Sequence, residues 1–412
     1  MAMMGRLSRA PRCCKAATTF RFDMSAKMSC YSPPACLLQP MVVPPRQLFG
    51  PGPSNMRDAI AESQSMSLLG HLHPEFLKVM SDARQGMQYV FKTRNTYTFA
   101  VSGTGHAGME CAILNLLEQG DVLLVVEIGI WGKRAADLGS RIGATVHTVT
   151  APHGSAVEID AIREALEKYK PAVLFVCHGE SSTGVMQPLE GLAESCARYG
   201  TLLLVDSVAS LGGADFRMDE WGVDCVYSAT QKVLNAPPGL APISFSEKAM
   251  HKIRNRKVRV PTFYFDALEL GNYWGCDDQP IRYHHTAPIS CVYALRSALA
   301  IVAKEGIDEG VKRHKENAKF LYEKLKQAGL HCFVAEEKWR LPCLTTVKVP
   351  DGVDWKGVIE EMMKDGIEIA GGLGPTVGKL WRIGTFGGNS SKEKIEKVIA
   401  SLEKAIRKKS TP

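Results

Sequence analysis

Residues 202–206 read LLLVD and residues 227–239 read YSATQKVLNAPPG, and these two stretches decide the expected fold. The first is a short apolar run that ends in a carboxylate, which is typical of a buried parallel strand that carries Asp206 to the edge of a sheet. The second places Lys232 after another short strand and before an APPG turn, which continues neither a helix nor a central strand. We therefore expect Lys232 to lie on a loop at a strand end, where open α/β sheets bind ligands.

The pattern along the rest of the chain predicts an α/β protein with two domains. Apolar strand-like runs alternate with helical runs from about 97 to 245, which is typical of a doubly wound, mostly parallel sheet. Residues 50–305 are expected to form this large domain, after an amino-terminal arm of residues 24–49. Residues 306–412 are expected to form a smaller α+β domain, with amphipathic helices over 308–327, 354–364 and 392–408.

Composition narrows the class of protein. The chain has 412 residues, is 45% hydrophobic and contains no apolar run of about 18 residues, so we expect no membrane-spanning helix. Residues 1–23 carry +4 of the formal net charge of +7, so the rest of the chain is nearly balanced and nucleic acid is a poor candidate partner. The 12 cysteines include no C-x-x-C pair, which indicates free thiols in a reducing compartment.

The two opening stretches also carry a resemblance. Residues 206–213 (DSVASLGG) and 228–232 (SATQK) resemble the cofactor segments of the class V aminotransferases, and closely those of the alanine:glyoxylate and serine:pyruvate aminotransferases. The resemblance runs from about 48 to 399 and implies fold type I with pyridoxal 5'-phosphate as cofactor. It implies that Lys232 forms a Schiff base with the cofactor aldehyde and shuttles the substrate α-proton. Asp206 would keep the pyridine nitrogen protonated.

A glycine-rich loop allows a second interpretation. Residues 102–108 read SGTGHAG, between an apolar run and a helical pattern, and match G-x-G-x-x-G. Glu127 ends the next apolar run at about the distance expected of a ribose-binding acid, so the loop locally predicts dinucleotide binding. A helix amino terminus binds any phosphate, however, so the loop is evidence for phosphate rather than for NAD. An NAD-dependent dehydrogenase therefore stays an alternative.

The resemblance assigns further cofactor contacts. Trp131 lies at a strand-to-helix junction and would stack on the pyridine ring, with core packing as the alternative role. Ser181 follows an expected strand over 172–177 and would contact the cofactor or the substrate carboxylate, while Glu180 has no assigned role. The residues that the resemblance places at the cofactor phosphate are Thr104, Gly105, His106 and Gln231.

Arg382 is the expected substrate anchor. It stands in the apolar segment 380–384, and burying its charge without an anionic partner would be costly. A structural salt bridge would meet that need, but the resemblance assigns the guanidinium to the α-carboxylate of the amino acid or keto acid substrate. In the family, the counterparts of Tyr283 and Thr286 reach the cofactor phosphate of the partner subunit, which predicts a homodimer.

Two further interpretations concern ligands and nucleophiles. His284 and His285 are adjacent, so their side chains are expected to point to different sides, and no metal site is expected. Cysteine desulfurases share the fold and the lysine but require a mobile nucleophilic cysteine. A desulfurase is therefore the second enzymatic alternative. Cys343 is a candidate for this cysteine, but it lies at an expected strand entry and would be inert if buried.

The amino terminus predicts a destination. Residues 1–23 hold basic residues among serines and threonines, with no acid before Asp23, which is typical of a mitochondrial transit peptide; a disordered basic tail is the alternative. Shorter family members begin near Met24, so a start there would give a second, peroxisomal or cytosolic product. The chain ends in KKSTP (408–412), which does not match the S-K-L type of peroxisomal signal.

The expected activity follows from the resemblance. We expect an aminotransferase that moves the amino group of L-alanine, and of L-serine, to glyoxylate or pyruvate by a ping-pong mechanism. Its partners would be small amino acid and keto acid substrates, in a role of glyoxylate detoxification. A dehydrogenase would leave Asp206, Lys232 and Arg382 without a joint purpose.

Overall fold

The computed structural model describes residues 33–410, so the expected transit peptide of residues 1–23 and the candidate start at Met24 lie outside the described residues. The chain divides into two compact units, Met1–Pro45 and Arg46–Pro412. The described part of the first unit contains a short 3-10 helix, η1 (Ala35–Leu38). The second unit contains the sheet and the residues discussed below.

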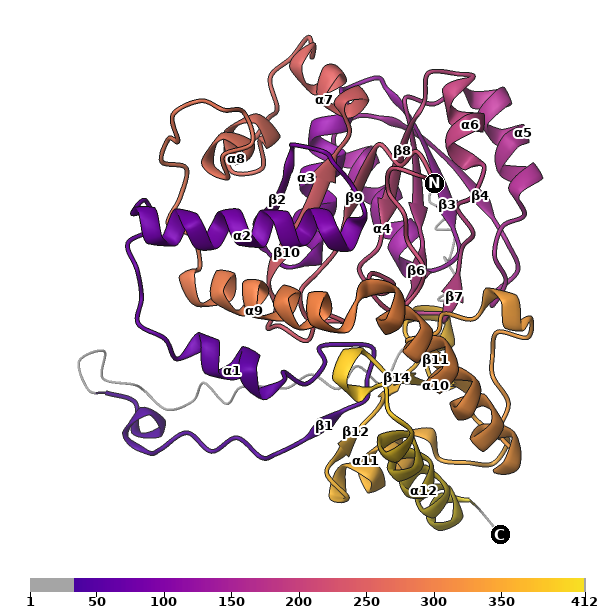
Figure 1. The fold of residues 1–412 in the computed structure, drawn as a ribbon. Coiled ribbons are helices and arrows are strands. Elements are labelled where there is room, and N and C mark those ends of the chain that lie inside the picture. Colours follow the sequence, from indigo (N-terminus) through magenta and orange to yellow (C-terminus); the bar gives the residue numbers. More distant parts are fainter. Residues whose placement is uncertain (1–32, 411–412) are drawn as a thin grey trace, which may run out of the picture. The chain divides into compact units, whose positions relative to one another are not determined.

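A seven-stranded sheet forms the centre of the second unit (Figure 1). Its strands, in spatial order, are β2 (Thr98–Gly103), β10 (Gly239–Phe245), β9 (Cys225–Tyr227), β8 (Leu202–Asp206), β5 (Val173–Cys177), β3 (Val122–Glu127) and β4 (Thr145–Thr150). Strand β10 is antiparallel to both of its neighbours, and the other pairings are parallel. The expected mostly parallel sheet is therefore confirmed.

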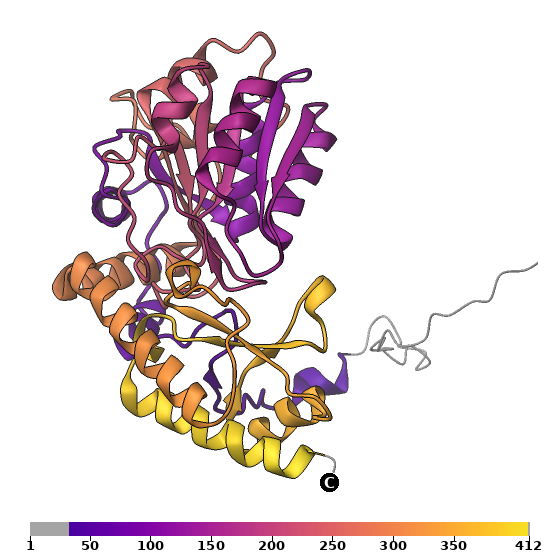
Figure 2. The same cartoon turned by 90° about the vertical axis from the view of Figure 1, so that its right-hand side faces the viewer.

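Helices cover both faces of this sheet (Figure 2). Those that pack against it or against each other are α2 (Pro74–Phe91), α3 (Gly105–Leu116), α4 (Ile130–Arg141), α5 (Ile159–Tyr169), α6 (Leu192–Ala197), α7 (Glu247–Arg254), α8 (Ala267–Tyr273) and α9 (Ile289–Glu305). Helices α3 and α4 pack together, as do α5 and α6. The chain reverses its direction across the sheet at β4, and the general rule of right-handed crossovers then places the two pairs on opposite faces. Within residues 33–410, no helix combines the length and hydrophobicity that a membrane crossing needs.

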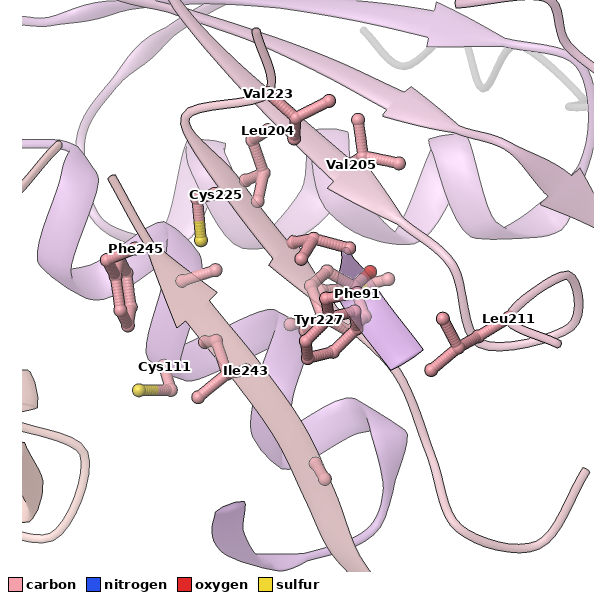
Figure 3. Close-up of a cluster of buried hydrophobic side chains, with 14 of the residues drawn as sticks. Phe91, Cys111, Leu204, Val205, Leu211, Val223, Cys225, Tyr227, Ile243 and Phe245 are labelled. Carbon is pink, nitrogen blue, oxygen red and sulfur yellow. The ribbon is translucent and has the colours of Figure 1, made fainter. Parts of the chain in front are cut away.

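The strands are apolar along their whole length because both faces of the sheet are buried. Figure 3 shows part of this core, where Cys225 and Tyr227 of β9 lie near Ile243 of β10 and Cys111 of α3. Tyr227 is completely buried, and a buried phenol needs a hydrogen-bond partner for its hydroxyl group. That partner is a residue of the candidate site.

The carboxyl-terminal part adds a second layer. Its elements are α10 (Ile307–Gln327), α11 (Trp355–Lys364), α12 (Lys392–Lys409) and an antiparallel sheet of β11 (Leu344–Lys348), β14 (Leu380–Gly384) and β13 (Ala370–Gly371). Strand β1 (Gln47–Leu48) pairs with β12 (Ile367–Glu368), next to a second buried cluster around Phe49 and Trp381. The three long helices match their expected ranges to within one residue. The domain boundary at 306 stays a prediction, because Arg46–Pro412 forms one compact unit.

Candidate active site

The candidate site lies at the carboxyl edge of the sheet, where β2, β8 and β9 end. Gly105, the first residue of α3, is so tightly packed that a Cβ atom there would lie 3.1 Å from Val208 and 3.2 Å from Ala229. Val208 follows β8 and Ala229 follows β9, so the start of α3 lies directly against the segments that carry Asp206 and Lys232. The structure thus brings the glycine loop together with both residues.

Asp206 ends β8 and is 3% exposed. The hydroxyl group of Tyr227 donates to its Oδ2 at 2.6 Å, and the backbone N–H of Val208 donates to its Oδ1 at 2.8 Å. Burial raises the pKa of Asp206 to about 6, although these two bonds and the charge of Lys232 act in the opposite direction. A cation placed beside this buried carboxyl group would stabilise its charged form.

Tyr227 was not among the residues expected in the site. It lies directly across from Asp206 in the parallel pairing of β8 and β9. Its hydroxyl group is therefore in reach of the carboxylate at the strand end. The only sequence signal was a tyrosine within a short strand that is otherwise apolar, and that signal does not name the partner.

A glycine- and proline-rich loop holds Lys232 in place. Its Nζ donates to the carbonyl oxygen of Pro51, and the hydroxyl group of Ser54 donates to its backbone carbonyl at 2.6 Å. Gly52 has a φ of +110°, and a Cβ atom there would lie 2.7 Å from Cδ of Lys232, so a larger residue would displace the lysine. The ring of Phe386 lies 5.6 Å from Nζ.

The amine of Lys232 loses its proton more readily than an ordinary lysine. Burial lowers its pKa to about 8; the charge of Arg382 also lowers it, and the charge of Asp206 raises it. At pH 7 about one amine in ten is then neutral, against roughly one in 3,000 for an unperturbed lysine. Lys232 can therefore act as a nucleophile and as a base near neutral pH.

Trp131, the second residue of α4, is held by three neighbours. Its Nε1–H donates to Oγ of Ser181 at 2.8 Å, and its backbone N–H donates to Oε2 of Glu180 at 3.0 Å. The His106 ring lies edge-on to the indole, with centroids 5.4 Å apart and planes at 74°. These contacts fix the indole beside the glycine loop, and its stacking on a cofactor stays a prediction.

The structure indicates a role for Glu180, to which the sequence assigned none. The carboxyl group is completely buried and also accepts a hydrogen bond from the backbone N–H of Ser182 at 2.8 Å. Burial raises its pKa to about 7. By accepting from Trp131 in the first turn of α4, Glu180 satisfies a backbone donor that the helix leaves free. It therefore positions Trp131.

Arg382 lies in the middle of β14 and is 8% exposed. Its Nε donates to the carbonyl oxygen of Gly371 at 2.8 Å, and its Nη1 donates to that of Ser181 at 3.3 Å. Both acceptors are neutral, and within residues 33–410 no ion pair joins Arg382 to a carboxylate. The alternative of a structural salt bridge thus finds no support in the described chain. The guanidinium is available to a carboxylate from outside.

The start of α3 can bind an anion. Thr104 is its N-cap residue, and the threonine side chain makes no capping hydrogen bond, so donors of the first turn stay free. Burial and the neighbouring Arg134, whose Nη1 lies 2.9 Å from Nε2 of His106, lower the pKa of His106. The buried side-chain oxygen of Gln231 has no partner among the described residues. If this amide is flipped, its NH₂ group takes that place as a donor.

Tyr283 and Thr286 are exposed and lie on the coil between α8 and α9. In the same coil, Nε2 of His285 lies 2.6 Å from Oγ of Ser102 in β2. The expectation that His284 and His285 point to different sides is wrong, because their Nδ1 atoms are 2.7 Å apart. The segment is irregular coil rather than an extended strand, so successive side chains do not alternate. In the described chain, no group of three or more His, Cys, Asp or Glu residues is arranged to hold a metal ion.

The sheet topology overturns the dinucleotide interpretation. In a dinucleotide-binding unit, the strand before the glycine loop and the next strand are parallel neighbours. Here β2 lies at one edge of the sheet and pairs with β10, whereas β3, which carries Glu127, lies next to the opposite edge. Glu127 instead has Nζ of Lys133 3.7 Å away. The glycine loop and the acid match the motif in sequence but lie far apart in the sheet.

Cys343 has the surroundings of an inert thiol. It is completely buried, and its Sγ–H donates to the carbonyl oxygen of Ala209 at 2.8 Å. Burial raises its pKa to about 12, so the nucleophilic thiolate is scarce at neutral pH. Cys343 directly precedes β11, so the expected strand entry is confirmed, and its burial meets the condition under which the thiol was expected to be inert. This residue offers no support for the desulfurase alternative.

Comparisons with known proteins agree with this geometry. The family model described as aminotransferase class-V matches residues 58–398. Alanine–glyoxylate aminotransferase of Callithrix jacchus is 46% identical over 385 residues, which cover 93% of each chain. That of Drosophila melanogaster is 46% identical over 91% of this chain and 96% of its own. The crystal structure of alanine–glyoxylate aminotransferase from Nostoc sp. matches with a TM-score of 0.87 at 45% identity, and the match covers 90% of this chain and 97% of that chain.

Proposed function

The chain belongs to the class V aminotransferases, which are pyridoxal phosphate enzymes of fold type I, and we propose that it transfers the amino group of L-alanine to glyoxylate. L-serine as a second donor and pyruvate as a second acceptor are part of this proposal. The observation that carries it is that Lys232 lies close enough to Asp206 and Arg382 for both charges to act on its pKa, Asp206 raising it and Arg382 lowering it. The names of the relatives at about 46% identity support the choice of substrates.

The residues at this edge fit pyridoxal phosphate. Lys232 would meet the aldehyde and Asp206 the ring nitrogen, while Trp131 would cover one face of the ring. The uncapped start of α3 suits the phosphate group. The Gln231 amide suits it in the flipped orientation, in which its NH₂ group takes the unpartnered place of the oxygen. When bound, the cofactor supplies an electron sink that stabilises negative charge on the substrate α-carbon.

The side chains of this protein have separate tasks in that reaction. Arg382 binds the substrate carboxylate and so orients the α-carbon. Lys232 takes the α-proton on its neutral amine and later returns a proton. Asp206 holds a proton on the ring nitrogen by its negative charge, and Tyr227 keeps that carboxylate in place. Because the keto acid product leaves before the acceptor binds, the kinetics would be ping-pong.

The experiment that tests the proposal is a visible absorbance spectrum of the protein loaded with pyridoxal phosphate. L-alanine alone should remove the band of the lysine-bound cofactor, and glyoxylate should restore it. L-serine and pyruvate, added in the same way, test the second pair of substrates. A band that stays unchanged with L-alanine would contradict the proposed donor.

The pKa of Lys232 predicts how fast the apoprotein takes up its cofactor. Only the neutral amine attacks the aldehyde, so the rate of loading should rise with pH, with a midpoint near 8. Arg382→Gln removes a cation that lowers this pKa, so the midpoint should move to higher pH; Asp206→Asn should move it to lower pH. Stopped-flow absorbance measures the rate, and a midpoint above 10 in the wild type would contradict the prediction.

Arg382→Gln should lower kcat/KM for both L-alanine and glyoxylate by about 100-fold, because the charged hydrogen bonds proposed between the guanidinium and the substrate carboxylate are lost. Arg382→Lys should recover only part of this loss, since lysine keeps the charge without the planar fork. Arg163→Gln, at an exposed ion pair with Asp160, is the matched control. Equal kcat/KM values in wild type and Arg382→Gln would remove the substrate role.

The oligomeric state and destination are also proposals. We propose a homodimer in which Tyr283 and Thr286 of one subunit complete the phosphate site of the other, and their exposure in the single chain supports this. A fully active monomer in sedimentation experiments would contradict it. We propose mitochondrial import by residues 1–23, with a second product from Met24; tagged forms with and without this segment should differ in location.

A further inference from the structure

A group of cationic side chains that the proposed reaction does not use lines a separate cavity. Arg57, Arg313 and Lys394 line this cavity of about 460 Å³, here called the Arg57 cavity. The side chains come from three parts of the chain, namely the start of α1 (Asp58–Gln64), α10 and α12. A volume of this size suits a small ligand.

The three cations differ in how far they are neutralised. Arg313 is an ion-pair partner of Glu305, with Nη2 3.0 Å from Oε2. Lys394 donates from Nζ to the carbonyl oxygen of Gly388 at 2.8 Å and to Oδ1 of Asn389 at 3.2 Å, and both acceptors are neutral.

Arg57 is the exception among the three. Within residues 33–410, its half-buried guanidinium has neither an ion pair nor a hydrogen bond. It lies over the backbone of the loop at Gly388, where a Cβ atom would come within 3.1 Å of its Nε. Burial lowers the pKa of both Arg57 and Lys394, and a neighbouring cation adds to this, namely Arg313 for Arg57 and Arg57 for Lys394.

Acidic side chains do not balance this charge. Glu305 is already bonded to Arg313, and Asp58 is exposed and has no ion pair in the described chain. In the described part of the chain, Arg57 and Lys394 therefore form no ion pair, and the carboxylates of Glu305 and Glu393 act on them only from a longer range. A partly buried charge of this kind is stabilised when an anion binds.

We propose that the Arg57 cavity binds a phosphate group, either as inorganic phosphate or as a small phosphate monoester. The two negative charges of phosphate match these two cations, whereas a single carboxylate matches one. A guanidinium fork and a lysine ammonium are the groups that proteins use for phosphate oxygens. The cavity also contains Asn55 and Ser390, whose side chains can donate hydrogen bonds.

The wall of the cavity is continuous with the loop of Lys232. The backbone N–H of Gly388 donates to Oδ1 of Asn235 at 2.6 Å. The backbone N–H of Asn235 donates in turn to the carbonyl oxygen of Lys232 at 3.1 Å. A ligand in the Arg57 cavity would thus contact the loop that supports the lysine. This location suits an effector site rather than a substrate site.

The test uses the protein loaded with pyridoxal phosphate, with free cofactor removed, so that the cofactor's own phosphate site is filled. Calorimetric titration with inorganic phosphate, at constant ionic strength set by chloride, should show saturable binding. Arg57→Gln and, independently, Lys394→Gln should each raise Kd at least tenfold. Arg141→Gln, which removes an exposed cation paired with Asp137, should leave Kd unchanged.

Several outcomes separate the possibilities. Equal Kd values in wild type, Arg57→Gln and Lys394→Gln would overturn the proposal, as would no binding at all. Saturable binding of malonate without binding of phosphate would overturn the assignment to phosphate. Glycerol 3-phosphate that binds at least as tightly as phosphate would support a monoester. Should Arg57→Gln not fold, as judged by its melting temperature, Lys394→Gln decides. The titration does not depend on which amino acid the enzyme uses.

Discussion

Lys232→Ala is expected to lower kcat for transamination by about 10⁴-fold, with nearly wild-type folding. The amine that takes the α-proton is lost, and general acid–base catalysis alone contributes 10² to 10⁴. The covalent hold on the cofactor is lost as well. The gap left by the side chain adjoins Gly52 and the Phe386 ring, so the loop loses packing contacts. Within the described chain, Asp206 is the one buried charged group that loses a neighbouring cation.

Two measurements make this result specific to the amine. Steady-state kinetics should show the loss in kcat, while the melting temperature of the apoprotein should change little. Lys364→Ala removes an exposed lysine that pairs with Glu361 on α11 and should retain wild-type kcat. Added methylamine should restore part of the activity of Lys232→Ala if the missing group is a base. Wild-type turnover in Lys232→Ala would remove the lysine from the mechanism.

The position of Lys232 could be predicted from sequence because its surroundings are local. An apolar run that ends in Asp206, a second short strand and an APPG turn are each visible within a few residues. Asp206 does end β8, and Lys232 does lie on a turn that follows β9. The ranges of the long helices were predictable for the same reason, since an amphipathic repeat of 3.6 residues is a local signal.

Contacts that depend on the pairing of distant segments could not be predicted in this way. The hydrogen bond between Tyr227 and Asp206 depends on the register of β8 against β9. The hydrogen bond that Glu180 accepts at the start of α4 depends on the segment after β5 lying next to that helix. The glycine loop shows the converse. Its motif is local, and the expected order of strand, loop and helix is confirmed, but its relation to Glu127 depends on strand order, which the spacing does not contain.

Asp206→Asn should lower kcat by about 10³-fold, because a neutral amide does not hold a proton on the ring nitrogen of the cofactor. Asparagine has the same shape, and its oxygen can still accept from the hydroxyl group of Tyr227 or from the N–H of Val208. The loss should therefore appear in kcat and in the pH dependence of the cofactor spectrum, with the fold retained. An amide variant with wild-type kcat would show that the charge of Asp206 is not needed.

The apoprotein should respond to Asp206→Asn in the opposite sense. The folded pKa of Asp206 is about 6, above its usual value, so the folded state binds the proton more tightly than the unfolded state does. The protonated carboxyl group of Asp206 therefore contributes to the free energy of unfolding at low pH, and this contribution is lost as the pH rises through 6. Without cofactor, the variant should thus be more stable than wild type at pH 8, by roughly 1–3 kcal/mol, with a smaller difference at pH 4. Melting temperatures of both apoproteins at the two pH values test this. The variant would then show a gain in apoprotein stability at pH 8 together with a loss of kcat. That result would mean that the charge of the buried carboxylate serves catalysis and lowers the stability of the cofactor-free protein.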